Sequence, residues 1–484
     1  MKSFFDVIFI TFRECIFLVA AVSMLSSCMT VGPDYSPPEM QTPAEWQKEV
    51  GNTPDDLSNQ DTPASWWTTF NDPVLTTLME RAVSENLSLK EALSRVRQAR
   101  IQRGITKADK YPSVDGTGSI GRSYREDDII GDFTGTDSFR FGLDASWELD
   151  IFGGVKRSLE VSDAELQAIQ ESFRNVLVSL LAETATNYIQ MRSYQSRLSV
   201  AEANLKTQEE TFNITQWRYQ AGLTTALDVE RASANLERTR SQIPSLKSSL
   251  EKTKNRIAVL LGGQPGALDI ELDTYTPVPI APGEIAVGIP ADLLSRRPDL
   301  RKAERDLAAQ TARIGTAEAR RYPRITLSGN IGLDALNLGD LVGIDSLSTG
   351  VASGISWPVF KAGAIMKNIE LQWELQDQVL LAYKAALLTA LEDVENALTS
   401  YAYELARREH LLKESQSAQR SAEISRAQYS SGLIDFQSVL DTERTLLSSQ
   451  DQVAQSDAQV ILNLISLYKA LGGGWQSASF DKES

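Results

Sequence analysis

One cysteine near the start of the chain has the surroundings of a lipid attachment site. A stretch of mostly apolar residues, 16–25, leads into Ser26-Ser27-Cys28. A stretch of that length fits the core of a signal peptide and is too short to be a permanent transmembrane helix. Small residues before a cysteine match the bacterial lipobox, in which the cysteine is diacylated and becomes the new N-terminus. We therefore predict a signal peptide at 1–27 and lipid on Cys28; an ordinary cleavage site beside an incidental cysteine is the alternative.

The remaining chain offers little chemistry for catalysis or metal binding. It has one histidine, His410, and its other cysteine, Cys15, lies in the predicted signal peptide. These counts exclude a His/Cys zinc site and a disulfide framework. Residues 116–121 fit G-x-G-x-x-G, but a helix precedes them and a polar loop follows, whereas nucleotide binding needs a strand before and a helix after. We predict no enzyme activity, no cofactor and no metal; an enzyme on a lipoprotein scaffold has no supporting constellation.

The composition excludes two further classes of protein. Among 484 residues, 64 Asp and Glu stand against 48 Lys and Arg, which gives a net charge of -16. Nucleic-acid binding needs a cationic surface, so we predict no nucleic-acid partner. Apolar residues at 42% and charged residues at 23% fit neither a disordered chain nor a polytopic membrane protein.

The chain contains two copies of one structural unit. Residues 219–263 align without a gap with residues 429–473, and two earlier blocks match in the same order. Three ordered matches at nearly one spacing indicate an internal duplication. We expect repeat one at 65–263, a linker at 264–289 and repeat two at 290–474.

Each repeat has the same expected order of elements. A helix of about thirty residues ends at a Tyr-Pro pair, because proline disfavours helix in the residue before it. Two strands follow, then a very long helix, a turn with glycine and a returning helix. The expected strands are 113–124, 138–149, 324–333 and 348–357, the long helices 152–221 and 361–431, and the return helices 225–262 and 435–471. Residues 28–64 form a lipid-anchored N-terminal tether, and residues 475–484 form a C-terminal tail.

The strands alternate between apolar and polar residues, as a sheet with two different faces requires. From Phe139 to Leu149, every second residue is apolar. A sheet on a soluble core gives this period, and so does a membrane barrel with strands of about ten residues. Four strands cannot close, and an open edge cannot face lipid. Two chains would supply eight strands and a filled interior; three would supply twelve and leave room for passage.

The long helices have a second period. Apolar residues from Phe173 to Tyr219 keep a 4-3-4-3 spacing, which implies supercoiling. A helix of about 70 residues is roughly 105 Å long, which suits a structure that crosses a compartment. A solvent-exposed structural coiled coil is the alternative. The expected fold is therefore mainly α with a membrane β-barrel: a coiled-coil α-barrel and four strands per chain, which form a twelve-stranded barrel in a trimer.

Two motifs resemble those of the outer membrane factors, the TolC-like lipoprotein channels of tripartite efflux systems. Residues 66–75, Trp-Trp-Thr-Thr-Phe-Asn-Asp-Pro-Val-Leu, resemble the family's opening motif. Residues 290–300, which contain Arg-Arg-Pro-Asp-Leu, resemble its counterpart in repeat two. The lipobox, Gly32-Pro33-Asp34-Tyr35 and both Tyr-x-x-Gly turns match as well. The resemblance covers about residues 28–474 and implies a homotrimer with a twelve-helix periplasmic tunnel and an equatorial belt built from 264–289 and the tail.

The resemblance also implies partners and site residues. It places the protein in the cell outer membrane, lipid-anchored, with its tunnel in the periplasm, docked to a periplasmic adaptor that an inner-membrane pump drives. The predicted docking tips are Gly222, Leu223, Thr224, Gly432, Leu433 and Ile434. Charged residues past the second turn line the closed aperture in the family, which implies Asp441 and Arg444, with Asp435 as a second ring.

Two alternatives stay open at this point. Asp441 and Arg444 lie one helical turn apart, so an exposed ion pair is the simpler interpretation of their spacing. Efflux is the expected function, but the outer-membrane channel of a type I protein-secretion system would have the same sequence features. The sequence does not separate them, because the pump and not the tunnel selects the cargo.

Overall fold

The computed structural model describes residues 30–47, 65–126, 133–268, 272–281, 290 and 293–477. The predicted signal peptide and the predicted acylation site Cys28 lie outside the described residues, as does part of the predicted linker 264–289. The chain divides into two compact units, each built from three segments. Unit 1 contains Met1–Glu39, Val96–Ile169 and Lys302–Tyr383, and unit 2 contains Met40–Arg95, Gln170–Arg301 and Lys384–Ser484.

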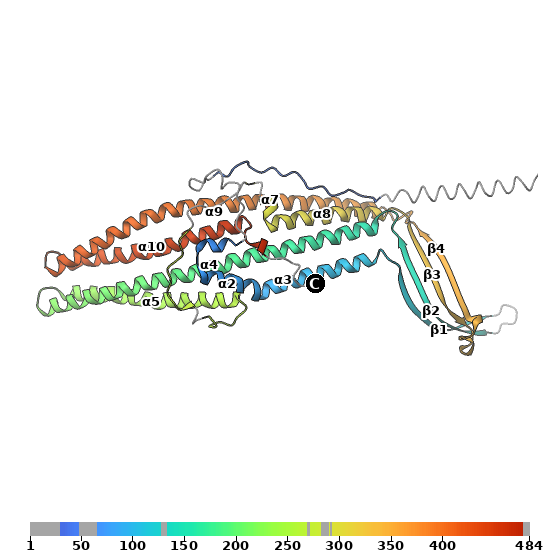
Figure 1. Cartoon of the computed structure of the whole chain (residues 1–484), viewed down its shortest axis with the longest axis horizontal. Helices are drawn as coiled ribbons and strands as arrows, with labels where there is room; N and C mark the ends of the chain where they lie inside the picture. The colour runs from blue at the N-terminus through green and yellow to red at the C-terminus, as the bar shows by residue number, and fades with distance from the viewer. Residues whose placement is uncertain are drawn as a thin grey trace, which may run out of the picture. The chain divides into compact units, whose positions relative to one another are not determined.

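Unit 1 contains one four-stranded antiparallel sheet with the order β1-β2-β3-β4 (Figure 1). Its central pair joins the two repeats, because β2 belongs to repeat one and β3 to repeat two. The polar positions of neighbouring strands meet across the sheet, as Arg140 of β2 does with Asp334 of β3. The strands are β1 Ser113–Glu126, β2 Phe133–Leu149, β3 Arg324–Ala335 and β4 Leu347–Ser356.

The same tryptophan contact joins strand to helix in both repeats. Trp147, near the end of β2, donates its Nε1–H to the carbonyl oxygen of Lys110 at 3.1 Å. Trp357, just after β4, donates to the carbonyl oxygen of Arg321 at 3.0 Å. Lys110 and Arg321 follow the helices α3 Leu87–Ala108 and α8 Pro298–Ala319. The duplication seen in the sequence is therefore also a duplication of contacts.

Two helical hairpins continue the repeats. Each long helix has 67 residues and returns through a shorter helix of 35 residues. Among the described residues, a mainly helical fold with one four-stranded sheet and two repeats confirms the fold expected for a single chain. No helix among the described residues is long and apolar enough to cross a membrane. The helices are α4 Gly154–Gln220 and α5 Ala226–Leu260 in repeat one, and α9 Ala364–Ser430 and α10 Phe436–Ala470 in repeat two.

The helix of about thirty residues expected at the start of each repeat is wrong, because each is two helices. In repeat one, α2 Pro73–Glu85 and α3 are separated by Asn86, whose ψ angle of 129° lies outside the helical region. In repeat two, α7 Leu293–Arg296 and α8 are separated by Arg297, which precedes a proline and is therefore disfavoured in a helix. The apolar pattern continues across both breaks, so periodicity alone did not reveal them.

The motif at 66–75 builds part of the core of unit 2. Trp66, on the short 3-10 helix Trp66–Phe70, is 1% exposed and stacks on Tyr468 of α10, with ring centroids 5.2 Å apart. Asp72 caps α2 by accepting from the backbone N–H groups of Val74 and Leu75. Its other carboxylate oxygen accepts a hydrogen bond from the hydroxyl of Tyr188 on α4 at 2.6 Å. This motif therefore fastens α2 to the long helix α4 and to the return helix α10.

Candidate functional site

The candidate site lies where the two hairpins of unit 2 turn, between α4 and α5 and between α9 and α10 (Figure 1). Gly222 and Gly432 have φ angles of 75° and 76°, which side chains other than glycine rarely adopt. In both turns the glycine N–H donates to a tyrosine carbonyl three residues earlier. The next residue donates five residues back, from Leu223 to Arg218 and from Leu433 to Gln428. Both turns are therefore Schellman motifs, which end α4 and α9 at defined residues.

Both return helices begin with a pair of capping residues, and the hydroxyl and the carboxylate exchange positions between the repeats. The cap is a threonine followed by an aspartate in α5, and an aspartate followed by a serine in α10. In α5, the Thr225 hydroxyl accepts from the Asp228 N–H, and the Asp228 carboxylate accepts from the Thr225 N–H. In α10, the Asp435 carboxylate accepts from both the N–H and the hydroxyl of Ser438, at 3.0 and 2.7 Å. These bonds from Ser438 hold the pKa of Asp435 below its ordinary value. Asp435 is thus a helix cap, and its predicted place in a second aperture ring stays a prediction.

The predicted docking residues differ in exposure. Leu223 and Leu433 are 66% and 74% exposed, so each turn presents an apolar side chain to its surroundings. Thr224 instead donates its hydroxyl to the Asp228 carboxylate at 2.7 Å. Ile434 packs against a buried cluster around Tyr429 and Phe436. The two leucines are therefore available for contact, whereas Thr224 and Ile434 hold the turns in shape.

Arg218 links the two hairpins, a role that was not predicted from the sequence. Its guanidinium lies over the Tyr429 ring, 4.7 Å from the centroid. One nitrogen, Nη1, donates to the carbonyl oxygens of Tyr429 and Ser430 at 3.0 and 3.3 Å. A residue of repeat one therefore caps the last turn of α9 in repeat two. The available signal was the difference between the repeats, because Gln428 occupies the corresponding position.

The charged run after the second turn points in three directions. Asp441 is exposed and accepts a hydrogen bond from Gln437 of its own helix at 3.0 Å. Glu443 is 4% exposed and accepts from the hydroxyl of Thr211 on α4 at 2.7 Å. Arg444 reaches α5, where its Nε–H donates to Asn235 at 3.3 Å. Among the described residues no ion pair joins Asp441 to Arg444, so the exposed ion pair considered from their spacing does not form within one chain.

Glu443 is the second residue whose role was not predicted from the sequence. Burial raises the pKa of its carboxyl group above the ordinary value, although the Thr211 hydroxyl and the Arg426 guanidinium act in the opposite direction. It stood in the sequence between residues taken as aperture candidates, where an acidic side chain is ordinarily exposed. In the structure it lies between α10 and α4, and it therefore contributes to hairpin packing.

Side chains for metal or nucleotide chemistry are not gathered in the part of the chain that the structure describes. No group of three or more His, Cys, Asp or Glu side chains there could hold a metal ion. Residues 116–121, the G-x-G-x-x-G match, lie inside β1 and not between a strand and a helix. His410 lies within α9.

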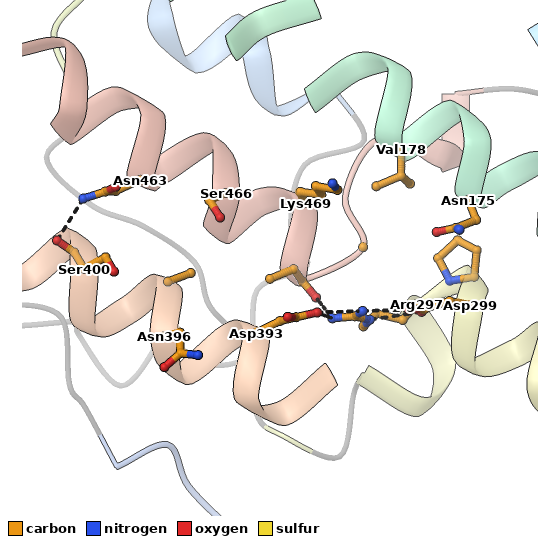
Figure 2. Close-up of a pocket in the computed structure, with 14 residues that line it drawn as sticks. Asn175, Val178, Arg297, Asp299, Asp393, Asn396, Ser400, Asn463, Ser466 and Lys469 are labelled. Atoms are coloured by element: carbon orange, nitrogen blue, oxygen red, sulfur yellow. Dashed lines mark hydrogen bonds and ion pairs between the residues drawn. The ribbon is translucent and has the colours of Figure 1, made fainter. Parts of the chain in front are cut away.

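The motif that ends in Pro298-Asp299-Leu300 forms a polar joint beside a cavity of about 310 Å³ (Figure 2). Arg297 donates from Nη1 to the carbonyl oxygen of Ala470, the last residue of α10, at 3.1 Å. It also binds the carboxylates of Asp393 on α9 and Asp299 on α8, at 3.1 and 2.7 Å. The motif therefore connects the first residues of α8 with α9 and with the end of α10, and these contacts account for its charged residues.

Comparison with known proteins identifies the family. Residues 78–263 and 289–473 each match the family described as outer membrane efflux protein, which also confirms the duplication. Nodulation protein T of Rhizobium leguminosarum bv. trifolii is 34% identical over 454 residues, covering 93% of this chain and 96% of that protein. The pyoverdine export outer membrane protein OpmQ of Pseudomonas aeruginosa is 30% identical over 469 residues, covering 94% and 97%.

A solved structure of an outer-membrane channel supports the same family assignment. The outer-membrane channel OprN is 34% identical and superposes with a TM-score of 0.86, covering 92% of this chain and 99% of that chain. The resemblance based on the two motifs is thus confirmed over nearly the whole length. The chain belongs to the outer membrane efflux protein family and is an outer-membrane efflux channel protein.

Proposed function

We propose that three copies of this chain form one channel. The sheet of unit 1 leaves β1 and β4 as its edges, and these two strands run in opposite directions. An open edge cannot stay unpaired in lipid, whereas β4 of one copy beside β1 of the next would form an antiparallel pair. Twelve strands leave an aqueous passage, while eight are filled by side chains. The four-stranded sheet with complementary open edges is the observation that carries this proposal.

The proposed channel continues into the periplasm through the hairpins and docks an adaptor at their tips. The support is the pair of exposed leucines, Leu223 and Leu433, each held by a Schellman turn. An exposed apolar side chain on a rigid turn suits contact with another protein better than contact with water. The adaptor would couple the channel to an inner-membrane pump. The name of OpmQ assigns pyoverdine export to that protein, which favours small-molecule efflux over protein secretion for this chain as well.

Asp441 is our proposed aperture residue, with Arg444 in a supporting role. Among the described residues, the only hydrogen bond to the Asp441 carboxylate comes from Gln437 of its own helix, which leaves this carboxylate free to face a threefold axis. At an effective dielectric of about 20, two carboxylates ~6 Å apart repel by roughly 3 kcal/mol. Arg444 is held by Asn235 of α5 and would position α10. The ring would thus favour opening, and packing between the hairpins would oppose it.

The lipid proposal rests on the sequence. Cys28 follows a signal-peptide core and small residues, and its acylation would add a lipid anchor to the barrel in the outer membrane. Because the barrel already crosses the membrane, loss of this lipid should leave much of the trimer membrane-bound.

The test combines assembly and docking. We expect the purified protein to have the mass of three chains and to conduct ions in planar bilayers. Leu433→Asp should leave both properties intact but reduce cross-linking to a periplasmic adaptor several-fold, because it places charge where an apolar contact forms. Ser421→Asp is the matched control, since it adds the same charge to an exposed position of α9 about three turns before the tip.

Two outcomes would contradict the proposal. A monomer or dimer that still conducts would exclude closure by three sheets. Unchanged adaptor cross-linking in Leu433→Asp, combined with Leu223→Asp, would place docking elsewhere on the hairpins.

A further inference from the structure

The first described residues, 30–35, are bound along their length to the rest of unit 1, and we call them the N-terminal strap. The Val31 N–H donates to the carbonyl oxygen of Phe152, between β2 and α4, at 3.2 Å. Arg157 of α4 donates to the carbonyl oxygens of Val31 and Gly32, both at 3.0 Å. The same guanidinium forms an ion pair with Asp34 at 2.8 Å. The side chain of Arg157 is 4% exposed, so the strap covers a buried cation.

Close backbone packing fixes the strap as well. Gly32 has a φ angle of 87°, and a side-chain carbon added there would lie 2.4 Å from the Cα of Gly315 on α8. A side-chain carbon on Gly315 would lie 2.8 Å from Arg157. Strap, α8 and Arg157 thus fill the same small space, and any larger residue at either glycine would force them apart.

A second attachment lies three residues further along. The Tyr35 hydroxyl donates to the carboxylate of Glu304 on α8 at 3.0 Å, and Arg305 lies over the Tyr35 ring. Burial and the neighbouring Glu304 carboxylate raise the pKa of Tyr35, so the hydroxyl keeps the proton that it donates. The ring packs on buried alanines of α4 and α8. The Gly32-Pro33-Asp34-Tyr35 motif is therefore a bound peptide here, whereas the sequence suggested a tether.

The position of the strap has a consequence for lipid attachment. Cys28 precedes Thr30 by two residues, and two residues span at most about 7 Å. Thr30 itself contacts Gly153 at the start of α4 and accepts a hydrogen bond from Lys156. We propose that Arg157 is a positioning residue, which binds the strap so that the lipid on Cys28 leaves the protein at the boundary between β2 and α4. This inference rests on the proposed acylation of Cys28, and its effect is to hold the lipid beside the end of the sheet.

The first arm of the test measures the strap alone. Hydrogen exchange in the full-length trimer should show protection of the Val31 amide in the wild type and its loss in Arg157→Ala. Arg157→Lys should restore protection only in part, because a lysine cannot bind several acceptors in a planar fork. Lys156→Ala is the matched control: it removes the neighbouring cation, whose bond to the strap goes to the Thr30 hydroxyl, and protection should persist. Protection that survives in Arg157→Ala would overturn the role of Arg157.

The second arm separates positioning from a merely structural role. Arg157→Ala is compared in the acylated protein and in a Cys28→Ser chain exported with a signal peptide that is cleaved without acylation. If Arg157 acts through the lipid, Arg157→Ala should lower the fraction of assembled trimer several-fold in the acylated protein. It should lower that fraction little in the Cys28→Ser chain, because the effects of coupled residues are not additive. An equal loss in both backgrounds would overturn the proposal.

Mass spectrometry of the mature N-terminus keeps the two failures apart. An unmodified Cys28 together with a protected Val31 amide would refute acylation and, with it, the lipid-positioning role. Binding of the strap by Arg157 would then still be supported. An acylated Cys28 with an unprotected Val31 amide in the wild type would refute binding of the strap and leave the proposed acylation intact.

Discussion

Both repeats have a break between their first two helices, with a similar backbone arrangement but different side chains. We call each break, together with its contacts to the end of the return helix, a joint. In repeat one, Asn86 performs two tasks: its Nδ2 donates to the carbonyl oxygen of Leu260, and its Oδ1 accepts from the Leu89 N–H, both at 2.8 Å. In repeat two, these tasks are divided. Arg297 donates to the carbonyl oxygen of Ala470, and Asp299 accepts from the Leu300 N–H at 2.9 Å.

Both joints share a close approach between the backbone that follows the return helix and the backbone just before the break. Gly262 and Gly472 both have a φ angle of 72°, and each lies against the carbonyl oxygen of the residue before the break, Glu85 or Arg296. A side-chain carbon would come within 2.7 or 3.0 Å of that oxygen. The duplication thus keeps the glycine contact and lets the hydrogen-bonding residues diverge. The larger arginine gains a contact with α9 that an asparagine cannot reach.

Arg297→Ala should have the largest effect on stability. It removes donors from the carbonyl oxygens of Ala470 and Ala390 and leaves Asp299 and Asp393 without their shared cation. The loss of buried hydrogen bonds to a charged group predicts a cost of about 3 kcal/mol, with the two carboxylates partly screened by solvent. Thermal unfolding of the detergent-solubilised protein measures it. A loss no larger than that of an exposed control, Lys413→Ala, would contradict the importance of the joint.

Rebuilding the repeat-one joint in repeat two should recover part of that loss. The double change Arg297→Asn with Asp299→Ser installs the residues found at positions 86 and 88. The asparagine can again donate to one helix end and cap the next, while the contact with Asp393 stays lost. We expect a cost of about 2 kcal/mol, smaller than that of Arg297→Ala. If the double variant is the less stable of the two, the joints are not interchangeable and the comparison fails.

Asn86→Ala tests the simpler joint. It removes the bond to Leu260 and the cap on α3, each of which is neutral, so the expected cost is about 1–2 kcal/mol. Asn86→Asp is the informative companion, because it keeps the cap but replaces the donor with a carboxylate oxygen that repels the Leu260 carbonyl oxygen. A cost equal to that of Arg297→Ala would show that the added charges of repeat two contribute no extra stability.

Arg218→Gln gives repeat one the residue that repeat two has at Gln428. The variant loses the bonds to the carbonyl oxygens of Tyr429 and Ser430, so the tip of α9 should fray at a local cost of about 1 kcal/mol. Hydrogen exchange should rise at Ser431 and Gly432, while the joints at Asn86 and Arg297 stay unchanged. Unaltered exchange at the tip would mean that the Schellman turn alone holds it.

The elements that were predictable from the sequence are those specified by local chemistry. Glycine turns, Tyr-Pro helix ends and alternating strands depend on neighbouring residues, and the duplication allowed each to be recognised twice. The strand expected from 138 begins earlier, at Phe133, because residues 133–137 pair with the end of β1, as Asp137 does opposite Arg122. Such pairing depends on the partner strand, and a segment of Gly, Thr and Asp resembles a loop when it is considered alone.

The candidate site was less predictable because its contacts join distant parts of the chain. Arg218 and Tyr429 lie on different hairpins. The same holds for the break between α2 and α3, where the role of Asn86 requires Leu260 at the other end of the repeat. Asp441 and Arg444 have the spacing of an ion pair, yet Asn235 of α5 binds Arg444. Spacing along a helix identifies which residues are neighbours on that helix, but the packing of adjacent helices decides which of them interact.

The smallest effect is expected for Glu443→Gln. This glutamate occurs only in repeat two, because the corresponding residue of repeat one is Ser233. Burial raises the pKa of Glu443, so ionising this side chain costs more free energy in the folded state than in the unfolded chain. Stability should therefore rise as the pH falls through the raised pKa and level off near the ordinary value of 4.5. Glutamine can still accept the Thr211 hydrogen bond without charge, so the variant should unfold at a slightly higher temperature than the wild type at neutral pH. That advantage should vanish as the pH approaches 4.5, and Glu414→Gln, on an exposed position of α9, should show no such dependence. An advantage that persists at low pH would mean that the benefit comes from packing and not from removal of a buried charge.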